Sequence, residues 1–395
     1  MVDIADRTGV NPASTGDATA AHARNASAPV PLNSIDSDRW MSLSERAIEP
    51  NGYYLPGWEL AVSTSARGRT GASALCAFDN TPSPRLIGLM PVVSLWRAWK
   101  IPLPALVSAD PYGTLCTPLL DRERADAAAA RLITQARSVG AHALVLRDVA
   151  LAGAAMQAFV AALRRDGLKM RLLHSYQRAS LDATKDSGQL LRDALGGKKL
   201  KELRRQRHRL AEHGTIRFDV ARTPETVPVA LQTFLSLEAS GWKGKRGTAL
   251  IQNDGDAAFI RRAAVTLAET GQCEIATLHA GETPIAAGIV LRHQDRAFFF
   301  KLGVDEHFAK YSPGVQLTLE LTRHLCADPT IASADSTAGA DHPMINPIWR
   351  GRFAVGDVLI PLHRNDPVVA LIHAAFIVRS SARGLARTAV RWLRK

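Results

Sequence analysis

One stretch of sequence decides the fold: it reads CEIATLHA from Cys273, TPIAAGIVLRH from Thr283 and RAFFFKLGV from Arg296. Short polar turns separate its three apolar runs, a pattern that is typical of neighbouring β-strands. The expected strands are Cys273–His279, Pro284–Arg292 and Ala297–Val304. After a polar connection the chain continues with regularly recurring leucines up to Leu325, which favours a helix. We therefore expect three strands followed by one helix at the centre of an α/β unit.

The start of that helix is built from residues that leave its backbone accessible. Ser312 suits the N-cap, and Pro313 suits the first helical position because an N–H there has no helical partner. Gly314 has no side chain to obstruct the first turn. Free N–H groups and the positive end of the helix dipole favour an anion such as a pyrophosphate. The same residues also make an ordinary structural cap, so both interpretations stay open.

Three motifs accompany this order of elements. They are EASGWKG at Glu238–Gly244, YSPG at Tyr311–Gly314, and DHPMIN at Asp341–Asn346 with Trp349. In this order they resemble the acetyltransferase-like domain of CelD-type cellulose and exopolysaccharide biosynthesis proteins. These belong to the GNAT acyltransferase superfamily and are related to the FemAB/FemX transferases. The resemblance spans roughly residues 193–361, and it implies an acyltransferase that uses acetyl-CoA or another acyl-CoA as co-substrate.

The resemblance also implies roles for individual residues. The acceptor must lose a proton, and the candidate bases are Glu238 and the Asp341/His342 pair. The expected cofactor-binding residues are Val304, Tyr311, Ser312, Gly314 and Val315. The expected substrate-binding residues are Trp242, Lys243, Lys199, Arg204, Lys301, Asp335 and Trp349. Simpler interpretations stand beside these: Glu238 as a surface residue or a partner of Lys243, His342 as a structural loop residue, and both tryptophans as core.

The first half of the chain repeats the order of strands and helices loosely. Expected strands are 73–79, 85–95, 105–108, 143–147 and 169–174, and expected helices are 121–138 and 152–165. Interleaved strands and helices imply an α/β (α+β) unit covered on both faces. With the resemblance, they predict tandem GNAT-like acyltransferase folds with mixed sheets flanked by helices. Because the first half has no glycine-rich helix start, we expect it to wall off the acceptor cleft without binding a cofactor.

These patterns divide the chain of 395 residues into four parts. They are a disordered tail (1–37), an N-terminal GNAT-like domain (38–182), a C-terminal GNAT acetyltransferase domain (183–365) and a basic amphipathic helix (366–395). The tail is assigned from its small and polar composition, which cannot repay the entropy of folding.

Cysteine and histidine usage restricts the chemistry. The four cysteines lie in or beside apolar runs with no short-spaced pairing, which indicates buried free thiols in a reducing compartment. The twelve histidines show no ligand spacing, so we expect no metal. The chain has no secretory start and no apolar run of about 18 residues. We expect a cytoplasmic protein, with peripheral contact to the inner membrane as an option.

The net charge of +12 gathers in two segments. Residues 198–209 carry seven Lys or Arg and one acid, Glu202. A helix here could hold a phosphorylated acceptor, because arginine forks pair with phosphate oxygens, or it could be a solvated basic face. Residues 366–395 have no acid after Asp366, and arginines recur every four residues from Arg379 to Arg391. Such a helix suits an anionic membrane surface, and a docking or solvated tail is the alternative.

Three functions follow from these patterns. The first is acyl-CoA-dependent N- or O-acetyl transfer to a polysaccharide-precursor, lipid-linked or small amine acceptor. The second is a FemX-type aminoacyl-tRNA-dependent transferase, favoured by residues 198–209 and by a phosphate loop that keeps only the central glycine of the GNAT pattern, Gly314. The third is a non-catalytic, membrane-associated scaffold of an exopolysaccharide cluster.

Overall fold

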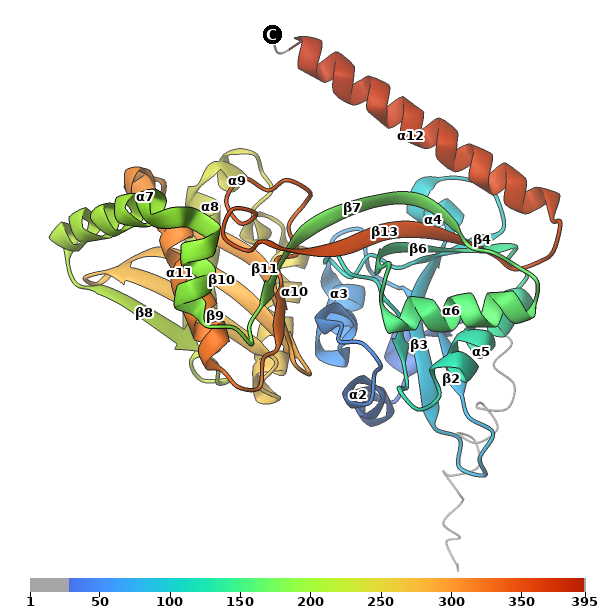
Figure 1. Cartoon of the computed structure of the whole chain (residues 1–395). Helices are drawn as coiled ribbons and strands as arrows, with labels where there is room; N and C mark the ends of the chain where they lie inside the picture. Colours follow the sequence, from blue (N-terminus) through green and yellow to red (C-terminus); the bar gives the residue numbers. More distant parts are fainter. Residues whose placement is uncertain (1–27, 394–395) are drawn as a thin grey trace, which may run out of the picture.

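A computed structural model describes residues 28–393, which form two lobes joined through one continuous mixed sheet (Figure 1). The strand order is β1-β2-β3-β4-β6-β13-β7-β12-β11-β10-β9-β8, with β5 pairing with β3. The strands are β1 (Val30–Pro31), β2 (Ser73–Phe78), β3 (Leu86–Ser94), β4 (Ala105–Ser108), β5 (Leu119–Leu120), β6 (Ala143–Ala150), β7 (Arg171–Asp182), β8 (Ile216–Ala221), β9 (Cys273–Ala280), β10 (Thr283–His293), β11 (Arg296–Val304), β12 (Ser333–Asp335) and β13 (Gly351–Pro361).

In the second half of the chain, helices cover both faces of the sheet. The helices α8 (Val227–Ser240) and α10 (Asp254–Glu269) pack on one face, and α7 (Ser187–Leu210) and α11 (Pro313–Ala327) pack on the other. Successive residues of β10 enter different cores: Ile289 lies with α8 and α10, whereas Val290 lies with α11. Because both faces of the strand are buried, its sequence is continuously apolar rather than alternating.

The first half has three apolar clusters around its strands. The helices α5 (Ala125–Ser138) and α6 (Ala154–Arg165) cover one face of the sheet. On the other face lie α2 (Ser37–Glu45), α4 (Leu95–Trp99) and the first turns of α12 (Pro367–Leu393). The helix α3 (Pro56–Ser65) instead packs against α10 of the second half, where the rings of Trp58 and Phe259 lie 5.0 Å apart.

Two long strands connect the halves. The last strand, β13, lies between β6 and β7, so the chain returns to the first half after completing the second. The end of β7 pairs with β12, where Ser180 is the partner of Asp335. Figure 1 shows β7 and β13 arching together between the two lobes. The expected boundary at residue 182 therefore falls at the end of a strand that both halves use.

The remaining helices are short. They are α9 (Trp242–Lys245) and the 3-10 turns η1 (Leu32–Ser34), η2 (Gly52–Tyr54), η3 (Ala211–His213), η4 (Leu250–Gln252) and η5 (Glu306–Tyr311). The mixed sheet flanked by helices confirms the predicted α/β class. The strands of residues 273–304 lie within two residues of their expected bounds.

The structure corrects two details of the sequence interpretation. Residues 28–37 are ordered and do not belong to a disordered tail, because β1 pairs with β2 and Leu32 is buried; the rest of that tail lies outside the described residues. The helices α3 and α4 were not expected: Pro56 in the first turn of α3 is a helix-start signal that was missed, and α4 has only five residues. Within residues 28–393 no helix is both long and apolar enough to cross a membrane.

Candidate functional site

A cavity of about 660 Å³ opens where β11 and β12 separate. The two strands pair only over Arg296–Phe298, and beyond Phe298 the chain after β12 turns away. This leaves one edge of β11 without a neighbouring strand. The Phe299 carbonyl accepts from Thr337 Oγ1 and the Leu302 carbonyl from Lys243 Nζ, and an extended ligand can pair with the remaining groups of this edge. The cavity is lined by Trp242, Lys243, Phe299–Leu302, Val304, Glu306, Ala309, Ser312–Val315, Ser336–Ala338, His342, Met344 and Ile345.

The start of α11 forms one wall of this cavity. Ser312 is its N-cap in the left-handed conformation, with a φ of 56°, and its side chain makes no capping bond. Pro313 stands in the first turn, and the first intrahelical bond runs from the Gln316 N–H to the Ser312 carbonyl at 3.0 Å. The N–H groups of Gly314 and Val315 precede that bond and have no partner within the helix. A Cβ on Gly314 would lie 2.9 Å from Leu302 Cδ2, so only glycine keeps this wall open.

The Glu238 carboxylate lies behind the opposite wall. It reaches this place because Gly303 lets α8 approach β11: a Cβ there would lie 2.9 Å from the Glu238 nitrogen. Its Oε1 accepts hydrogen bonds from Lys243 Nζ at 2.9 Å and Lys301 Nζ at 3.5 Å, and its Oε2 accepts one from the Leu250 N–H at 2.9 Å. The residue is only 2% exposed. Both oxygens are thus occupied by donors, away from the open space of the cavity.

These donors keep Glu238 ionised. Burial alone would raise the pKa of the Glu238 carboxyl, but Lys301, Lys243 and the Leu250 N–H outweigh it, and the pKa lies below its ordinary value. Burial lowers the pKa of the Lys301 ammonium, and the Glu238 carboxylate opposes that shift. Since two lysines share one carboxylate, this side of the cavity carries excess positive charge.

His342 lies on a third wall and is half-buried. Burial lowers the pKa of its imidazole below the ordinary value of 6.5, so the ring is neutral at pH 7. Asp341 is exposed, does not line the cavity and has a left-handed backbone with a φ of 54°. The structure therefore brings His342 to the cavity without the acid that precedes it in sequence.

Four other predicted residues lie away from the cavity. The Tyr311 hydroxyl is 3.0 Å from His213 Nε2, and the Trp349 indole donates to Thr322 Oγ1 at 2.9 Å inside the core. Lys199 pairs with Glu202 at 3.0 Å on the exposed side of α7, and Arg204 is also exposed on that helix. None of these side chains faces the cavity that Gly314 opens.

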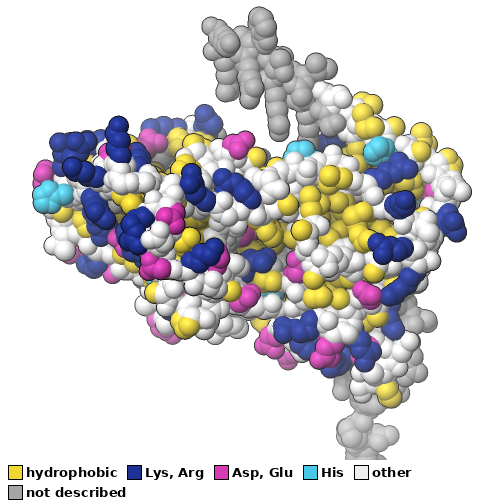
Figure 2. Space-filling model, in the orientation of Figure 1, with side chains coloured by type: hydrophobic (Ala, Val, Ile, Leu, Met, Phe, Trp, Pro, Cys, Tyr) yellow, Lys and Arg dark blue, Asp and Glu magenta, His cyan; other side chains and the backbone are white. Residues whose placement is uncertain are grey.

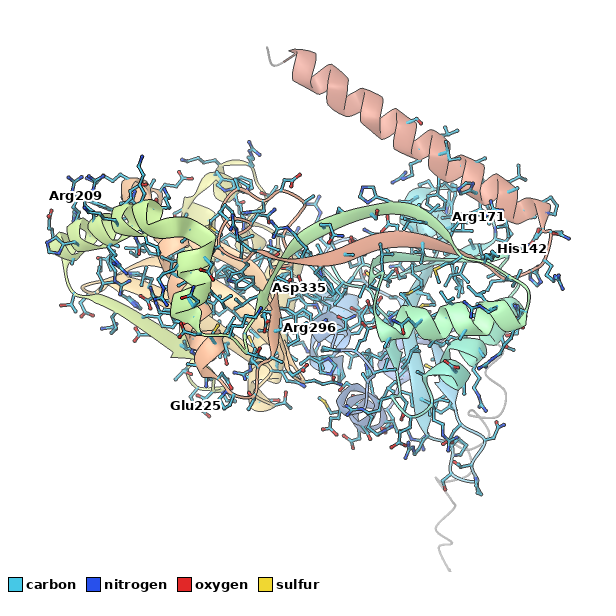
Figure 3. The ribbon with its side chains drawn as sticks, in the orientation of Figure 1. His142, Arg171, Arg209, Glu225, Arg296 and Asp335 are labelled. Atoms are coloured by element: carbon cyan, nitrogen blue, oxygen red, sulfur yellow. The ribbon has the colours of Figure 1, made fainter. Side chains whose placement is uncertain are left out.

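Asp335 is a buried structural residue at the junction of the two halves, where Figure 3 shows it between the lobes. It forms an ion pair with Arg178, which is fully buried and also donates to the Thr114 carbonyl at 2.6 Å. Thr114 Oγ1 in turn donates to the Thr337 carbonyl at 3.0 Å, and Thr337 Oγ1 donates to the Phe299 carbonyl at 2.6 Å. This chain of bonds positions Thr337 in the wall of the cavity.

Sequence patterns missed part of the lining. Phe299 and Phe300 read as ordinary strand residues, and Met344 and Ile345 were noted only as parts of a motif. Tyr112 comes from the first half: its hydroxyl donates to Asp256 Oδ2 at 2.8 Å, and its ring centroid lies 5.8 Å from Lys301 Nζ. Only tertiary packing places this tyrosine beside Lys301, so no local signal could have identified it.

Comparisons with known proteins agree with this geometry. Residues 197–342 match the family model described as an acetyltransferase (GNAT) domain, and these residues include α8, β9–β12 and α11. No curated protein matches the chain.

Solved structures share the fold at low identity. The structure of FemX superposes with a TM-score of 0.56 at 12% identity, covering 86% of this chain and 98% of that one. The C-terminal domain (DUF2156) of a proposed lysylphosphatidylglycerol synthetase from Agrobacterium fabrum gives 0.52 at 13%, covering 86% and 95%. A conserved protein of unknown function from Bacteroides thetaiotaomicron gives 0.51 at 12%, covering 85% and 99%. At this identity the likeness shows the fold alone.

Proposed function

We propose that the chain is an acyltransferase that binds an acyl-CoA, with acetyl-CoA as the first candidate, in the cavity beside α11. One observation carries this proposal: the uncapped start of α11 and the free edge of β11 meet in the same cavity. The start of α11 suits the pyrophosphate of CoA, and the edge of β11 suits the amide groups of its pantetheine chain. The match of residues 197–342 to an acetyltransferase model supports the same chemistry.

The reaction follows from the groups around the cavity. The acceptor nitrogen or oxygen attacks the thioester carbonyl carbon, so a bond to carbon forms as the C–S bond breaks. Neutral His342 takes the proton from the acceptor on Nδ1, which within residues 28–393 accepts only a long bond from the Met344 N–H at 3.4 Å, and returns it to the departing sulfur. The Lys301 ammonium stabilises the negative charge that develops on the carbonyl oxygen. Glu238 acts through Lys301 and Lys243 as a positioning residue, because its own oxygens are already occupied.

Titration of the full chain with acetyl-CoA tests the proposal. A ligand that binds only the folded state adds about 2.7 kcal/mol at a hundred times its dissociation constant, so the melting temperature should rise. Calorimetry should then show saturable binding of one equivalent. Absence of binding at millimolar acetyl-CoA would contradict an acyl-CoA donor.

A pH series tests His342 as the base. The pKa of His342 lies below 6.5, so the neutral imidazole, and with it kcat/KM, should increase as the pH rises through that range and then level off. Replacing His342 by glutamine should lower kcat by about 10² to 10⁴-fold and remove the rising limb. Replacing the neighbouring exposed Asp341 by asparagine should change neither. A rising limb that survives in the His342 variant would remove this residue from the proton transfer.

A FemX-type donor, an aminoacyl-tRNA, is the second candidate. The observation that favours it is the basic surface of α7, where Lys198, Lys199, Lys201, Arg204, Arg205 and Arg209 are exposed. Figure 2 shows Lys and Arg side chains gathered at that end of the molecule. If this donor is used, binding of tRNA should weaken steeply with salt, because phosphate contacts release counterions.

The C-terminal helix supports a peripheral membrane contact. Val369 and Ile372 anchor the first turns of α12 in an apolar cluster with Leu95, whereas Leu371 and Val378 are exposed. Figure 3 shows Arg171 and His142 beside the start of this helix, which extends away from the lobes. Exposed apolar side chains near Arg171 suit an anionic lipid surface and an acceptor carried on lipid.

Vesicle sedimentation tests that contact. The full chain should co-sediment with vesicles of phosphatidylglycerol and phosphatidylcholine, and much less with phosphatidylcholine alone. A chain ending at Ser380 keeps the turns that pack in the core and the exposed Leu371 and Val378, but it lacks Arg383, Arg387 and Arg391 and should lose the preference for phosphatidylglycerol. Equal sedimentation of the two chains would show that residues 381–395 do not mediate membrane contact.

A further inference from the structure

A second cavity, of about 320 Å³, lies in the first half of the chain. Its wall comes from the segment after α3, from β3 and α4, from the end of β4 and from β6. It is lined by Arg67, Gly68, Arg69, Val93, Arg97, Ala98, Ser108, Ala109, Asp110 and Arg147. The first half thus contains a pocket with four guanidinium groups, and it is separate from the residues that line the cavity beside α11.

The charges of these arginines are not balanced within the cavity. Asp110 is the one acid in the lining: it pairs with Arg69 at 3.1 Å and approaches Arg147 at 3.9 Å. Arg97 is held by neutral groups, the carbonyls of Gly71 and Thr70, which orient its guanidinium without neutralising it. Asp148 and Asp357 also act on Arg147, but neither lines the cavity. Within the lining four guanidinium groups face one carboxylate, and Asp148 and Asp357 outside it offset part of that excess.

Buried polar groups near this cavity add no compensating charge. Burial raises the pKa of Glu59 well above its ordinary value, and Asp110 raises it further, which favours the neutral carboxyl. The Glu59 Oε2 and the Tyr54 hydroxyl are both buried and have no hydrogen-bond partner within the described residues. Each group interacts electrostatically with an arginine that lines the cavity: Glu59 with Arg69, and Tyr54 with Arg147. The cavity is cationic and polar rather than a hydrophobic slot.

Tyr112 lines neither cavity and lies packed between a residue of each. The Arg69 guanidinium lies 4.2 Å from the centroid of the Tyr112 ring, and Lys301 Nζ lies 5.8 Å from the same centroid. Only this ring and its two contacts therefore separate Arg69 from Lys301. Asp110 positions the ring by accepting the Tyr112 N–H at 2.9 Å. Arg69 of one cavity and Lys301 of the other thus contact the same aromatic ring.

We propose that this second cavity, lined by Arg67, Arg69, Arg97 and Arg147 and called here the arginine cavity, binds the phosphate or pyrophosphate group of an acceptor phosphoester. Planar guanidinium forks pair with phosphate oxygens at two points, and three or more around one site favour a dianion over a carboxylate. As a statement about the acceptor, this inference rests on the proposed acyl transfer. The inference that the cavity binds an anion depends only on the arginines that line it.

Inorganic pyrophosphate is the probe that tests the site. Calorimetry on the full chain at low salt should show saturable binding, and Arg147→Met should weaken it at least tenfold. Arg67 is exposed, and its side chain makes no hydrogen bond or ion pair within residues 28–393, so Arg67→Gln should weaken binding several-fold in a normally folded protein. Arg262→Gln, an exposed arginine of α10, is the matched control and should bind like the unmodified chain. Wild-type affinity in both Arg147→Met and Arg67→Gln would overturn the proposal.

Further measurements distinguish the arginine cavity from the cavity beside α11 and identify the kind of molecule that carries the phosphate. Pyrophosphate should still bind in the presence of saturating acetyl-CoA and to the Gly314→Val variant. The proposal for the arginine cavity and the proposal for acetyl-CoA binding are therefore tested independently. Displacement of pyrophosphate by UDP would indicate a nucleotide-linked acceptor, and displacement by geranyl diphosphate would indicate a lipid-linked one. Pyrophosphate that neither ester displaces would contradict an acceptor site.

Discussion

Replacing Gly314 by valine is expected to abolish acetyl-CoA binding while the protein stays folded. A Cβ at this position would lie 2.9 Å from Leu302 Cδ2 and 3.2 Å from Met344 Sδ, and the valine methyls would extend further into the cavity. They would also cover the N–H groups at the start of α11. We expect the dissociation constant to rise at least a hundredfold, about 2.7 kcal/mol, as measured by calorimetry.

Gly339→Val is the matched control for this substitution. Gly339 lies in the loop after β12, and a Cβ there meets no atom within 4 Å. This variant should bind acetyl-CoA like the unmodified chain, with an unchanged melting temperature. If Gly314→Val bound acetyl-CoA normally, the start of α11 would not be the binding site, whatever the rest of the cavity does.

Replacing Glu238 by alanine is expected to cause the largest loss of stability. The change removes a buried carboxylate that accepts bonds from Lys243, Lys301 and the Leu250 N–H. Breaking a buried ion pair costs about 3–5 kcal/mol. Because each lysine side chain keeps about a fifth of its surface exposed, we expect a loss near the lower end of that range in urea unfolding. Asp126→Asn, which breaks an exposed pair with Arg165, should cause little change.

The same carboxylate predicts a dependence of stability on pH. Its folded-state pKa lies below the ordinary 4.5, so it stabilises the folded state above that pH and this contribution is lost as the pH falls through the folded value. In Glu238→Gln the loss below pH 4.5 should be smaller. Turnover of Glu238→Gln should keep the rising limb of its pH profile, since His342 is the proposed base. Disappearance of that limb would instead identify Glu238 as the base.

The sequence by itself determined the local helices and strands and the residues that leave the start of α11 accessible. The three strands and the helix of residues 273–327 follow from apolar runs of strand length, turn residues and a proline at a helix start. These signals are local, because each depends on the conformational preferences of a few adjacent residues. The resemblance to the GNAT family, rather than local signals, assigned site roles to Gly314, Lys243, Lys301 and His342, and all four line the same cavity.

Only the tertiary structure decided how these elements combine. Nothing local indicates that β13 pairs with β6 and β7, because strand pairing depends on contacts between residues far apart in sequence. The same reason explains why the Glu238 carboxylate accepts hydrogen bonds from two lysines, and why Tyr112 lies between Arg69 and Lys301. A side chain's type is written in the sequence, but its partners, its burial and hence its protonation are set by neighbours that folding supplies.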